Sequence, residues 1–243
     1  TAGTLSKLGH LADRDGFTRV MEDQRELAVE IGKRHPGLGI VLLGHSFGSF
    51  VSQMLIERHG NLFAGCVLSG TRGPDPALVF SGRVLAFLVS LIAGKRTPSP
   101  FLTAVSFGSY NARVNDAASP NSWLSRDSSV VEEYDASPWC GFPCTAGFYR
   151  DLMRGLSVIH KPWAIAGVPS GLPVLIVSGA DDPVGSYGKT VRTLAELYRA
   201  AGVRDVSLVL YEGGRHEVLN ETNGSEVASD ILEWTDRVTG KNR

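Results

Sequence analysis

The chain has 243 residues, of which 43% are hydrophobic and 20% are charged, a balance typical of a globular protein with one large core and room for an insertion. The formal net charge of -1 disfavours nucleic acid as the main partner. No signal peptide is visible, so a cytoplasmic location is expected, while the absence of a methionine before Thr1 leaves open an upstream segment.

A surface loop and a long helix are the first elements predicted. Residues 1–16 are rich in Gly, Ser, Thr and Asp and show little periodicity, which predicts a loop. Residues 17–35 carry apolar side chains at helical spacing, among them Val20, Leu27 and Ile31, and predict a helix of about five turns. A Pro-Gly pair then ends the helix.

The next segment joins a predicted strand to a G-x-S-x-G pattern. Residues 40–43 form an apolar run, the pentapeptide GHSFG follows at 44–48, and residues 50–58 have the period of an amphipathic helix. A sharp strand-to-helix turn exposes its serine and directs N–H groups at an oxyanion, and glycines on both sides suit a turn with no room for Cβ atoms. We therefore predict Ser46 as a nucleophile and the Phe47 N–H as an oxyanion donor. The alternative is a serine that only caps a core helix.

A proline-rich stretch then interrupts the alternation of strand and helix. Residues 65–69 predict a second buried strand, and residues 72–170 predict an inserted cap, so that residues 1–71 and 171–243 form the core. Within the cap, residues 81–93 are an apolar helix candidate. Packing on the core and duty as a lid, which receives an acyl chain or meets a lipid surface, select the same side chains and are equally favoured.

The cap contains neither a predicted membrane span nor a metal motif. Residues 84–93, its most apolar part, would extend only about 15 Å as a helix, half of a bilayer core. Cys140 and Cys144 have no companion Cys or His pair, which disfavours zinc. We expect two unpaired thiols there, with a local disulfide as the alternative. Cys66 lies in a predicted strand, where a small hydrophobe would serve equally well.

Strand and helix alternate again after the cap. Two predicted strands, residues 173–179 and 206–211, are each followed by a polar loop and a helix, the helices covering residues 186–201 and 225–238. Open α/β sheets place their sites at the carboxyl ends of the strands. The loops after these two strands are therefore candidate site loops.

Three residues reproduce the chain order serine, acid, histidine of one type of catalytic triad. Ser46 would attack, His216 would take its proton and return it to the leaving group, and Asp182 would hold the imidazole tautomer. Asp182 precedes a proline that restricts its backbone, so we favour it over Asp181, which is expected to cap or to face solvent. His45 adjoins the nucleophile but is expected to point elsewhere on the turn.

The motifs GHSFGSF, VLSGTRG, GADDPV and YEGGRHEVLNE together resemble the monoacylglycerol lipase and lysophospholipase branch of the α/β-hydrolases, also described as serine-aminopeptidase-like. The resemblance implies the α/β class, with a mostly parallel sheet flanked by helices and an inserted cap. It also implies an ester hydrolase that forms an acyl-enzyme on Ser46 from monoacylglycerols or other short to medium acyl esters. Phe47 and Val184 would contact the substrate, and no metal or organic cofactor is implied.

The sequence departs from this family before the pentapeptide. Members begin with several further strands, one of them followed by a His-Gly loop that supplies a second oxyanion N–H, and none of these is found here. The N-terminal part of the fold is therefore expected to be absent, leaving residues 40–43 as an unpaired edge that favours self-association, and turnover is expected to be slow. A non-catalytic binding protein, or an amidase or peptidase with the same triad, remains the alternative.

Overall fold

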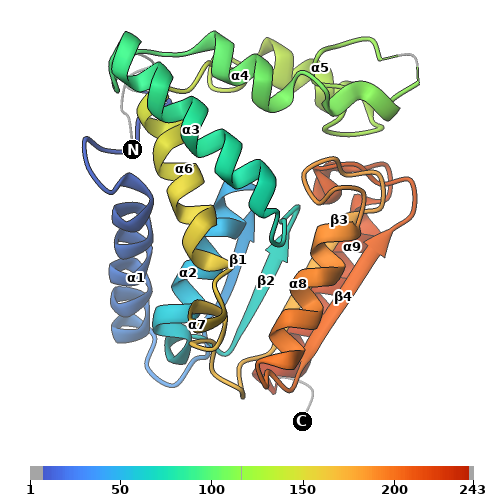
Figure 1. Ribbon diagram of the computed structural model, residues 1–243. Coiled ribbons are helices and arrows are strands. Elements are labelled where there is room, and N and C mark those ends of the chain that lie inside the picture. Colours follow the sequence, from blue (N-terminus) through green and yellow to red (C-terminus); the bar gives the residue numbers. More distant parts are fainter. Residues whose placement is uncertain (1–7, 116, 241–243) are drawn as a thin grey trace.

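The computed structural model describes residues 8–115 and 117–240 (Figure 1). It has a four-stranded parallel sheet within these residues, in the order β1 (Val41–His45), β2 (Gly65–Ser69), β3 (Val174–Gly179) and β4 (Val206–Tyr211). All four strands lie where the sequence predicts them, and the α/β class is confirmed. Residues 1–7 of the predicted N-terminal loop lie outside the described residues.

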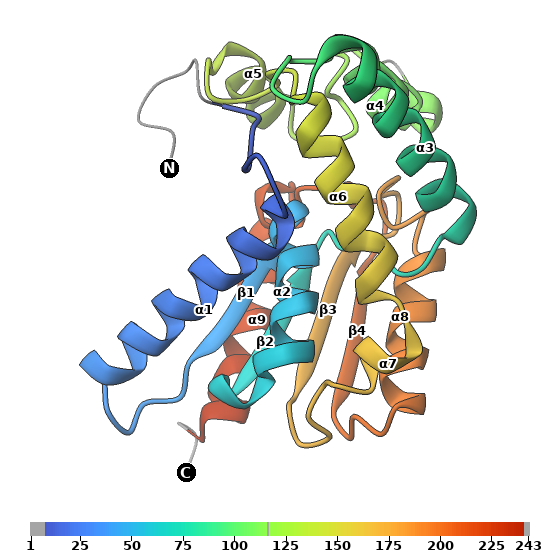
Figure 2. The ribbon, with the colours of Figure 1, turned by 60° about the vertical axis from the view of Figure 1, so that its left-hand side comes forward.

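Helices cover both faces of the sheet because side chains alternate along each strand. On one face lie α1 (Gly16–Arg34), α2 (Phe47–His59) and α8 (Lys189–Ala200), which share one buried cluster with Cys66, Leu68 and Ile176. On the other face, α9 (Gly224–Thr239) packs Val227 and Trp234 against Val67, Leu175 and Val177. Figure 2 shows the sheet between α2 and α9. The result is a sheet buried between two helical layers, as expected for the predicted fold.

The predicted edge is present at β1. Within the described residues, β1 pairs with β2 and with no other strand, in a register that places Leu43 beside Val67. The Leu43 side chain is 45% exposed. β1 therefore presents backbone groups and an apolar side chain on its free side.

The segment between β2 and β3 forms a helical layer at the carboxyl ends of the strands (Figure 1). Its helices are α3 (Pro76–Ala93), α4 (Pro100–Phe107), α5 (Ser128–Ala136) and the first part of α6 (Ala146–Ile159). α7 (Pro162–Ile165) lies beside the C-terminal end of α2, towards the amino ends of the strands. Short 3-10 helices lie at Gly60–Leu62, Tyr110–Arg113 and Val218–Asn220. α6 runs from this layer down to α1 and α2, where Leu156 and Ile159 join the main cluster. The division into a core and a cap at residues 72 and 170 stays a prediction.

α3 is longer than predicted, because it begins at Pro76 rather than at Ser81. Pro76 occupies the first turn, and the Asp75 carboxylate accepts the Leu78 N–H at 3.1 Å, which caps the helix. Of the helices in the described ranges, α3 alone is long and apolar enough to cross a membrane by length and composition, and 17% of it is buried. It packs along α6, and its other side is exposed (Figure 1).

One buried carboxyl makes the stability of the fold pH-dependent. Burial raises the pKa of Glu57 on α2 to about 9, from an ordinary value of 4.5. Between these two values the unfolded chain is ionised while the folded chain keeps its proton, so stability is full below pH 4.5 and falls by up to about 1.4 kcal/mol per pH unit as the pH rises towards 9. We expect Glu57→Gln to raise the melting temperature much more at pH 8 than at pH 5, whereas Glu196→Gln on the exposed side of α8 changes neither. Equal melting curves for wild type and Glu57→Gln at pH 8 would contradict this.

Candidate active site

Ser46 occupies a strained turn between β1 and α2. Its φ of 50° and ψ of -120° lie in a region that non-glycine residues rarely adopt. Hydrogen bonds on both sides hold this backbone, since the Ser46 N–H donates to the Ser69 carbonyl at 3.0 Å and the Ser46 carbonyl accepts the Ser49 N–H at 2.9 Å. The turn thus aims the serine side chain away from the sheet, as predicted for a nucleophile elbow.

The two glycines of the pentapeptide have different reasons to be there. A Cβ at Gly44 would overlap Ser52 Oγ and lie 2.6 Å from the Gly48 carbonyl oxygen, so this position has no room for a side chain. A Cβ at Gly48 would meet nothing within 4 Å. The expectation that both glycines are required for lack of space is therefore wrong for Gly48, which faces open space from the first turn of α2.

Gly44→Ala is expected to destabilise the fold by about 1–3 kcal/mol through overpacking of the elbow. Gly48→Ala is expected to be neutral or stabilising, since alanine favours a helix over glycine by about 1 kcal/mol. Urea denaturation of both variants tests the difference. Equal loss of stability in the two would mean that the backbone conformation, and not the missing space, selects glycine here.

Three side chains from three strand ends meet at the elbow. His216 Nε2 lies 2.9 Å from Ser46 Oγ, and His216 Nδ1 lies 3.0 Å from Asp182 Oδ2. Ser46 follows β1, Asp182 follows β3 and His216 follows β4, so the parallel sheet brings together residues far apart in the chain. His216 and Asp182 are both buried. The structure places the three predicted residues in one hydrogen-bonded line.

Hydrogen bonds from neighbouring residues of the chain hold the Asp182 carboxylate in place. The Val184 N–H donates to Asp182 Oδ1 at 2.8 Å, and the Ser178 hydroxyl lies 3.4 Å from Asp182 Oδ2. Asp181 is exposed, and its N–H donates to the Gly214 carbonyl. The Val184 side chain is buried in the main cluster, which fixes the position of the N–H that holds Asp182. The predicted contact of Val184 with substrate stays a prediction.

The charges around His216 favour its protonated form. Burial disfavours an imidazolium, but the Asp182 carboxylate, by its charge and its hydrogen bond, and the charge of Glu217 raise the pKa of His216 above its ordinary value. A histidine that accepts a proton from serine during a reaction becomes an imidazolium. The site is therefore built to stabilise the charge that such a step creates.

Comparison with known proteins assigns the family. Residues 3–223 match the model of the family described as Serine aminopeptidase, S33. The chain belongs to this family. A monoacylglycerol lipase of Mycolicibacterium smegmatis is 30% identical over 235 residues, which cover 93% of this chain and 71% of the lipase. The human monoglyceride lipase is 28% identical over 196 residues, covering 78% of this chain and 55% of that protein.

Solved structures agree with this assignment at the level of the fold. A thermostable carboxyl esterase from Bacillus coagulans superposes with a TM-score of 0.84 at 22% identity, over 92% of this chain and 72% of the esterase. A structure described as the open form of a lipase superposes with a TM-score of 0.80 at 27% identity, over 93% of this chain and 73% of that chain. The chain is an α/β-hydrolase, and together with the geometry above these relatives identify it as a serine hydrolase of the esterase and monoacylglycerol lipase type.

Phe47, whose N–H is predicted as an oxyanion donor, is the first residue of α2. The first N–H groups of a helix have no intrahelical acceptor and carry the positive end of its dipole. The Phe47 ring meets Phe17 edge-on at 5.7 Å and Phe148 of α6 at 5.4 Å between centroids. The elbow is thus braced by aromatic rings of α1 and α6, while the N–H group of Phe47 stays at the helix terminus.

His45 lies against the site rather than away from it, so the expectation for this residue is wrong. Its ring centroid is 4.9 Å from that of His216, and its Nδ1 lies 3.2 Å from Ser69 Oγ. A Cβ at Gly70, whose φ is +54°, would come within 2.9 Å of the His45 ring and 3.0 Å of the His216 ring. The left-handed turn at Gly70 therefore opens the space in which the two imidazoles pack together.

A segment of the cap is fastened to the loop that carries His216. The His216 N–H donates to the Trp123 carbonyl at 3.4 Å, and the two rings lie 5.0 Å apart. The buried Glu221 carboxylate accepts the Arg126 N–H at 3.0 Å, the Arg126 Nε–H at 2.8 Å and the Arg215 N–H at 2.9 Å. The sequence motifs do not single out Glu221 as the acceptor of these three donors.

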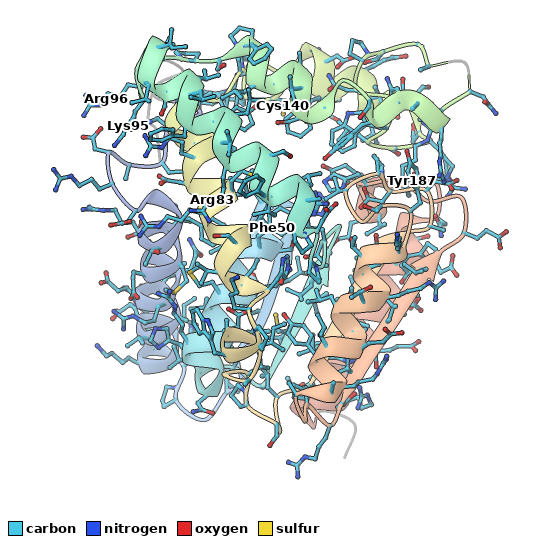
Figure 3. All side chains as sticks on the ribbon, viewed as in Figure 1. Phe50, Arg83, Lys95, Arg96, Cys140 and Tyr187 are labelled. Carbon is cyan, nitrogen blue, oxygen red and sulfur yellow. The ribbon has the colours of Figure 1, made fainter. Side chains whose placement is uncertain are left out.

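A second contact joins the cap to the loop of the acid. The Arg113 guanidinium lies 3.7 Å from the centre of the Tyr187 ring, and Figure 3 shows Tyr187 beneath the cap at the carboxyl end of the sheet. Cys140 lies in the cap layer in the same view, and Cys66, Cys140 and Cys144 are free thiols. In the described ranges, no group of three or more His, Cys, Asp or Glu side chains is placed to hold a metal ion.

Proposed function

We propose that the protein hydrolyses short to medium-chain acyl esters through an acyl-enzyme on Ser46. The observation that supports this most strongly is the continuous line of hydrogen bonds, 2.9 Å from Ser46 Oγ to His216 Nε2 and 3.0 Å from His216 Nδ1 to Asp182. This line contains the three groups that catalysis by a serine nucleophile requires, which are the nucleophile, the base and the residue that orients the base.

The proposed reaction has two balanced steps. Ser46 Oγ attacks the ester carbonyl while His216 Nε2 takes its proton, and the Phe47 N–H donates to the oxyanion of the tetrahedral intermediate. When the C–O bond to the alcohol breaks, His216 returns the proton to the departing alkoxide. Water then attacks the acyl-enzyme while His216 takes its proton. The bond between the acyl carbon and Ser46 Oγ breaks, His216 returns the proton to Ser46 Oγ, and the acid product leaves. Asp182 holds His216 in the tautomer with Nδ1 protonated and stabilises the imidazolium.

A fluorophosphonate probe and two substrate panels test the proposal against its alternatives. Labelling of Ser46 with turnover of p-nitrophenyl esters is the expected result. Labelling with turnover of aminoacyl anilides alone would favour an amidase, which the family description as serine aminopeptidases keeps as the second candidate. The absence of both labelling and turnover would favour a binding protein.

The exposed apolar side of α3 and α4 is proposed to contact the lipid surface that holds the substrate. Soluble proteins rarely expose large contiguous apolar patches without a binding role. The side chains that are exposed here are Phe80, Val84, Phe87, Leu88, Leu91, Ile92, Phe101 and Val105.

Serine substitutions at Leu91 and Ile92, which are 64% and 88% exposed, are expected to slow hydrolysis of emulsified caprylate esters and leave dissolved butyrate esters unaffected. These substitutions remove apolar side chains that would contact lipid, and they leave the packing of the core unchanged because both side chains are exposed. Leu232→Ser on α9, where the side chain is 63% exposed, is the matched control and is expected to change neither rate. If the α3 variant hydrolyses both substrates at the wild-type rates, this surface has no role in binding lipid.

We also propose that the protein self-associates through β1, which is an edge strand of the sheet within the described residues. Leu43 lies on the free edge, and the edge of a sheet offers unpaired backbone groups to another chain. Leu43→Lys is expected to shift the protein towards a monomer in size-exclusion chromatography. Leu27→Lys on α1, also an exposed leucine, is expected to leave the elution unchanged.

A further inference from the structure

A second carboxylate is held against the histidine that packs on His216: Glu217 contacts His45, whose ring centroid lies 4.9 Å from that of His216. Glu217 Oε1 lies 3.3 Å from His45 Nε2, and Glu217 Oε2 accepts the Asn220 side-chain N–H at 3.0 Å. The Glu217 backbone N–H donates to the Leu124 carbonyl of the cap at 2.8 Å. The carboxylate is therefore held by His45 of β1 and by Asn220 of its own loop, and the backbone of Glu217 by the segment between β2 and β3. No step of the reaction proposed above uses this carboxylate.

The charged state of Glu217 follows from these neighbours. Burial disfavours its ionised form, but the His45 and His216 imidazoles and the Asn220 amide outweigh burial and lower the pKa of Glu217 below its ordinary value. Glu217 is thus a carboxylate at neutral pH. The partly buried site weakens solvent screening, so its charge acts on the imidazole next to it.

We propose that Glu217 is a positioning residue for His216, a second carboxylate, anchored by His45 and Asn220, that stabilises the protonated imidazole alongside Asp182. Asp182 does this by a hydrogen bond to Nδ1, whereas Glu217 acts through space and leaves Nε2 free for Ser46. The proposal rests on the proposed function, because it concerns the base of that reaction.

Other charged and polar groups lie near His216 and Glu217. His45 contacts Ser69 Oγ through its Nδ1. Burial raises the pKa of Tyr134 on α5, and the charge of Glu217 adds a smaller contribution in the same direction. The Arg215 guanidinium donates to the Ser122 and Ser125 carbonyls of the cap, at 2.6 Å and 2.8 Å.

Glu217→Gln tests the proposal, since it keeps the shape and removes the charge. The acid limb of the pH profile of kcat/KM is expected to move to lower pH by about one unit, because His216 loses a stabilising charge. The plateau is expected to fall by up to about tenfold through kcat, with KM unchanged, because a less basic histidine is a weaker general base. Glu217→Asp retains the charge and is expected to restore most of the acid limb. Glu233→Gln, an exposed charge on α9, is the control and is expected to leave the profile unchanged.

A titration of His216 by NMR, in protein labelled with nitrogen-15 at histidine, provides a readout that needs no activity. The same downward shift of the His216 midpoint in Glu217→Gln is expected. An unshifted midpoint and acid limb, with a uniform loss of activity at every pH, would overturn the proposal and leave Glu217 a structural residue. Such a result would leave the proposed function intact, whereas failure of the fluorophosphonate to label Ser46 in the wild type would remove the function and not the titration shift.

Discussion

Ser46→Ala is expected to abolish ester hydrolysis and to lower kcat by about six orders of magnitude, the loss typical of removing the nucleophile from a serine triad. The substitution removes one hydroxyl, whose hydrogen-bond partner is His216 Nε2. It keeps the Cβ atom, so the backbone at φ 50° is no more strained than before. The fold should therefore survive while the reaction stops.

The measurement is kcat on p-nitrophenyl butyrate beside a thermal unfolding curve. Ser157→Ala, on the part of α6 away from the elbow, is the control and is expected to alter neither. Retention of more than a small part of the wild-type rate by folded Ser46→Ala protein would move the nucleophile elsewhere. If Ser46→Ala does not fold, Ser46→Cys keeps a side chain of similar size at this turn and is expected to fold while losing both ester turnover and labelling by the fluorophosphonate.

Asp182→Asn is expected to lower kcat by about four orders of magnitude, and Asp181→Asn is expected to leave it nearly unchanged. Asp182 is fully buried and accepts hydrogen bonds at both oxygens, from the Val184 N–H and from His216 Nδ1. An amide would present its NH2 group to one of these donors, which would break that bond or turn the imidazole to the wrong tautomer. Asp181 is exposed and makes no such contact.

The pair of variants is its own control, because the two residues are adjacent and chemically identical. Steady-state kinetics on one ester, with unfolding curves for both proteins, is sufficient. A larger loss in Asp181→Asn than in Asp182→Asn would transfer the role of the acid to Asp181. Equal small losses would mean that His216 keeps its tautomer without a carboxylate.

Short-range patterns were enough to predict the sheet and the elbow. The apolar runs at 40–43, 65–69, 173–179 and 206–211 each became a strand, and the GHSFG pentapeptide became the turn between β1 and α2. Parallel strands end at one side of a sheet, so the order of Ser46, Asp182 and His216 along the chain already predicted that they would lie together. Asp182 rather than Asp181 was favoured because of a local constraint, the proline that follows it.

The surroundings of individual side chains were not accessible in this way. His45 was expected to turn away, and the structure places its ring beside His216 because Gly70, on a different strand end, leaves the space. Gly48 was thought to lack room for a side chain, and it faces open space. Both errors concern what surrounds a residue rather than the conformation of the residue itself.

The sequence by itself determined the four strands and the turn at Ser46, and it placed Ser46, Asp182 and His216 at strand ends, because backbone preferences and side-chain periodicity are properties of neighbouring residues. Only the tertiary structure decided how the site is held: Glu221 ties the cap to the His216 loop, and His45 anchors Glu217. Glu221 and Arg126 are 95 positions apart in the chain, so no local pattern relates them. Their proximity depends on the packing of the cap over the sheet, which brings a charge and its partner together only after the whole chain has folded.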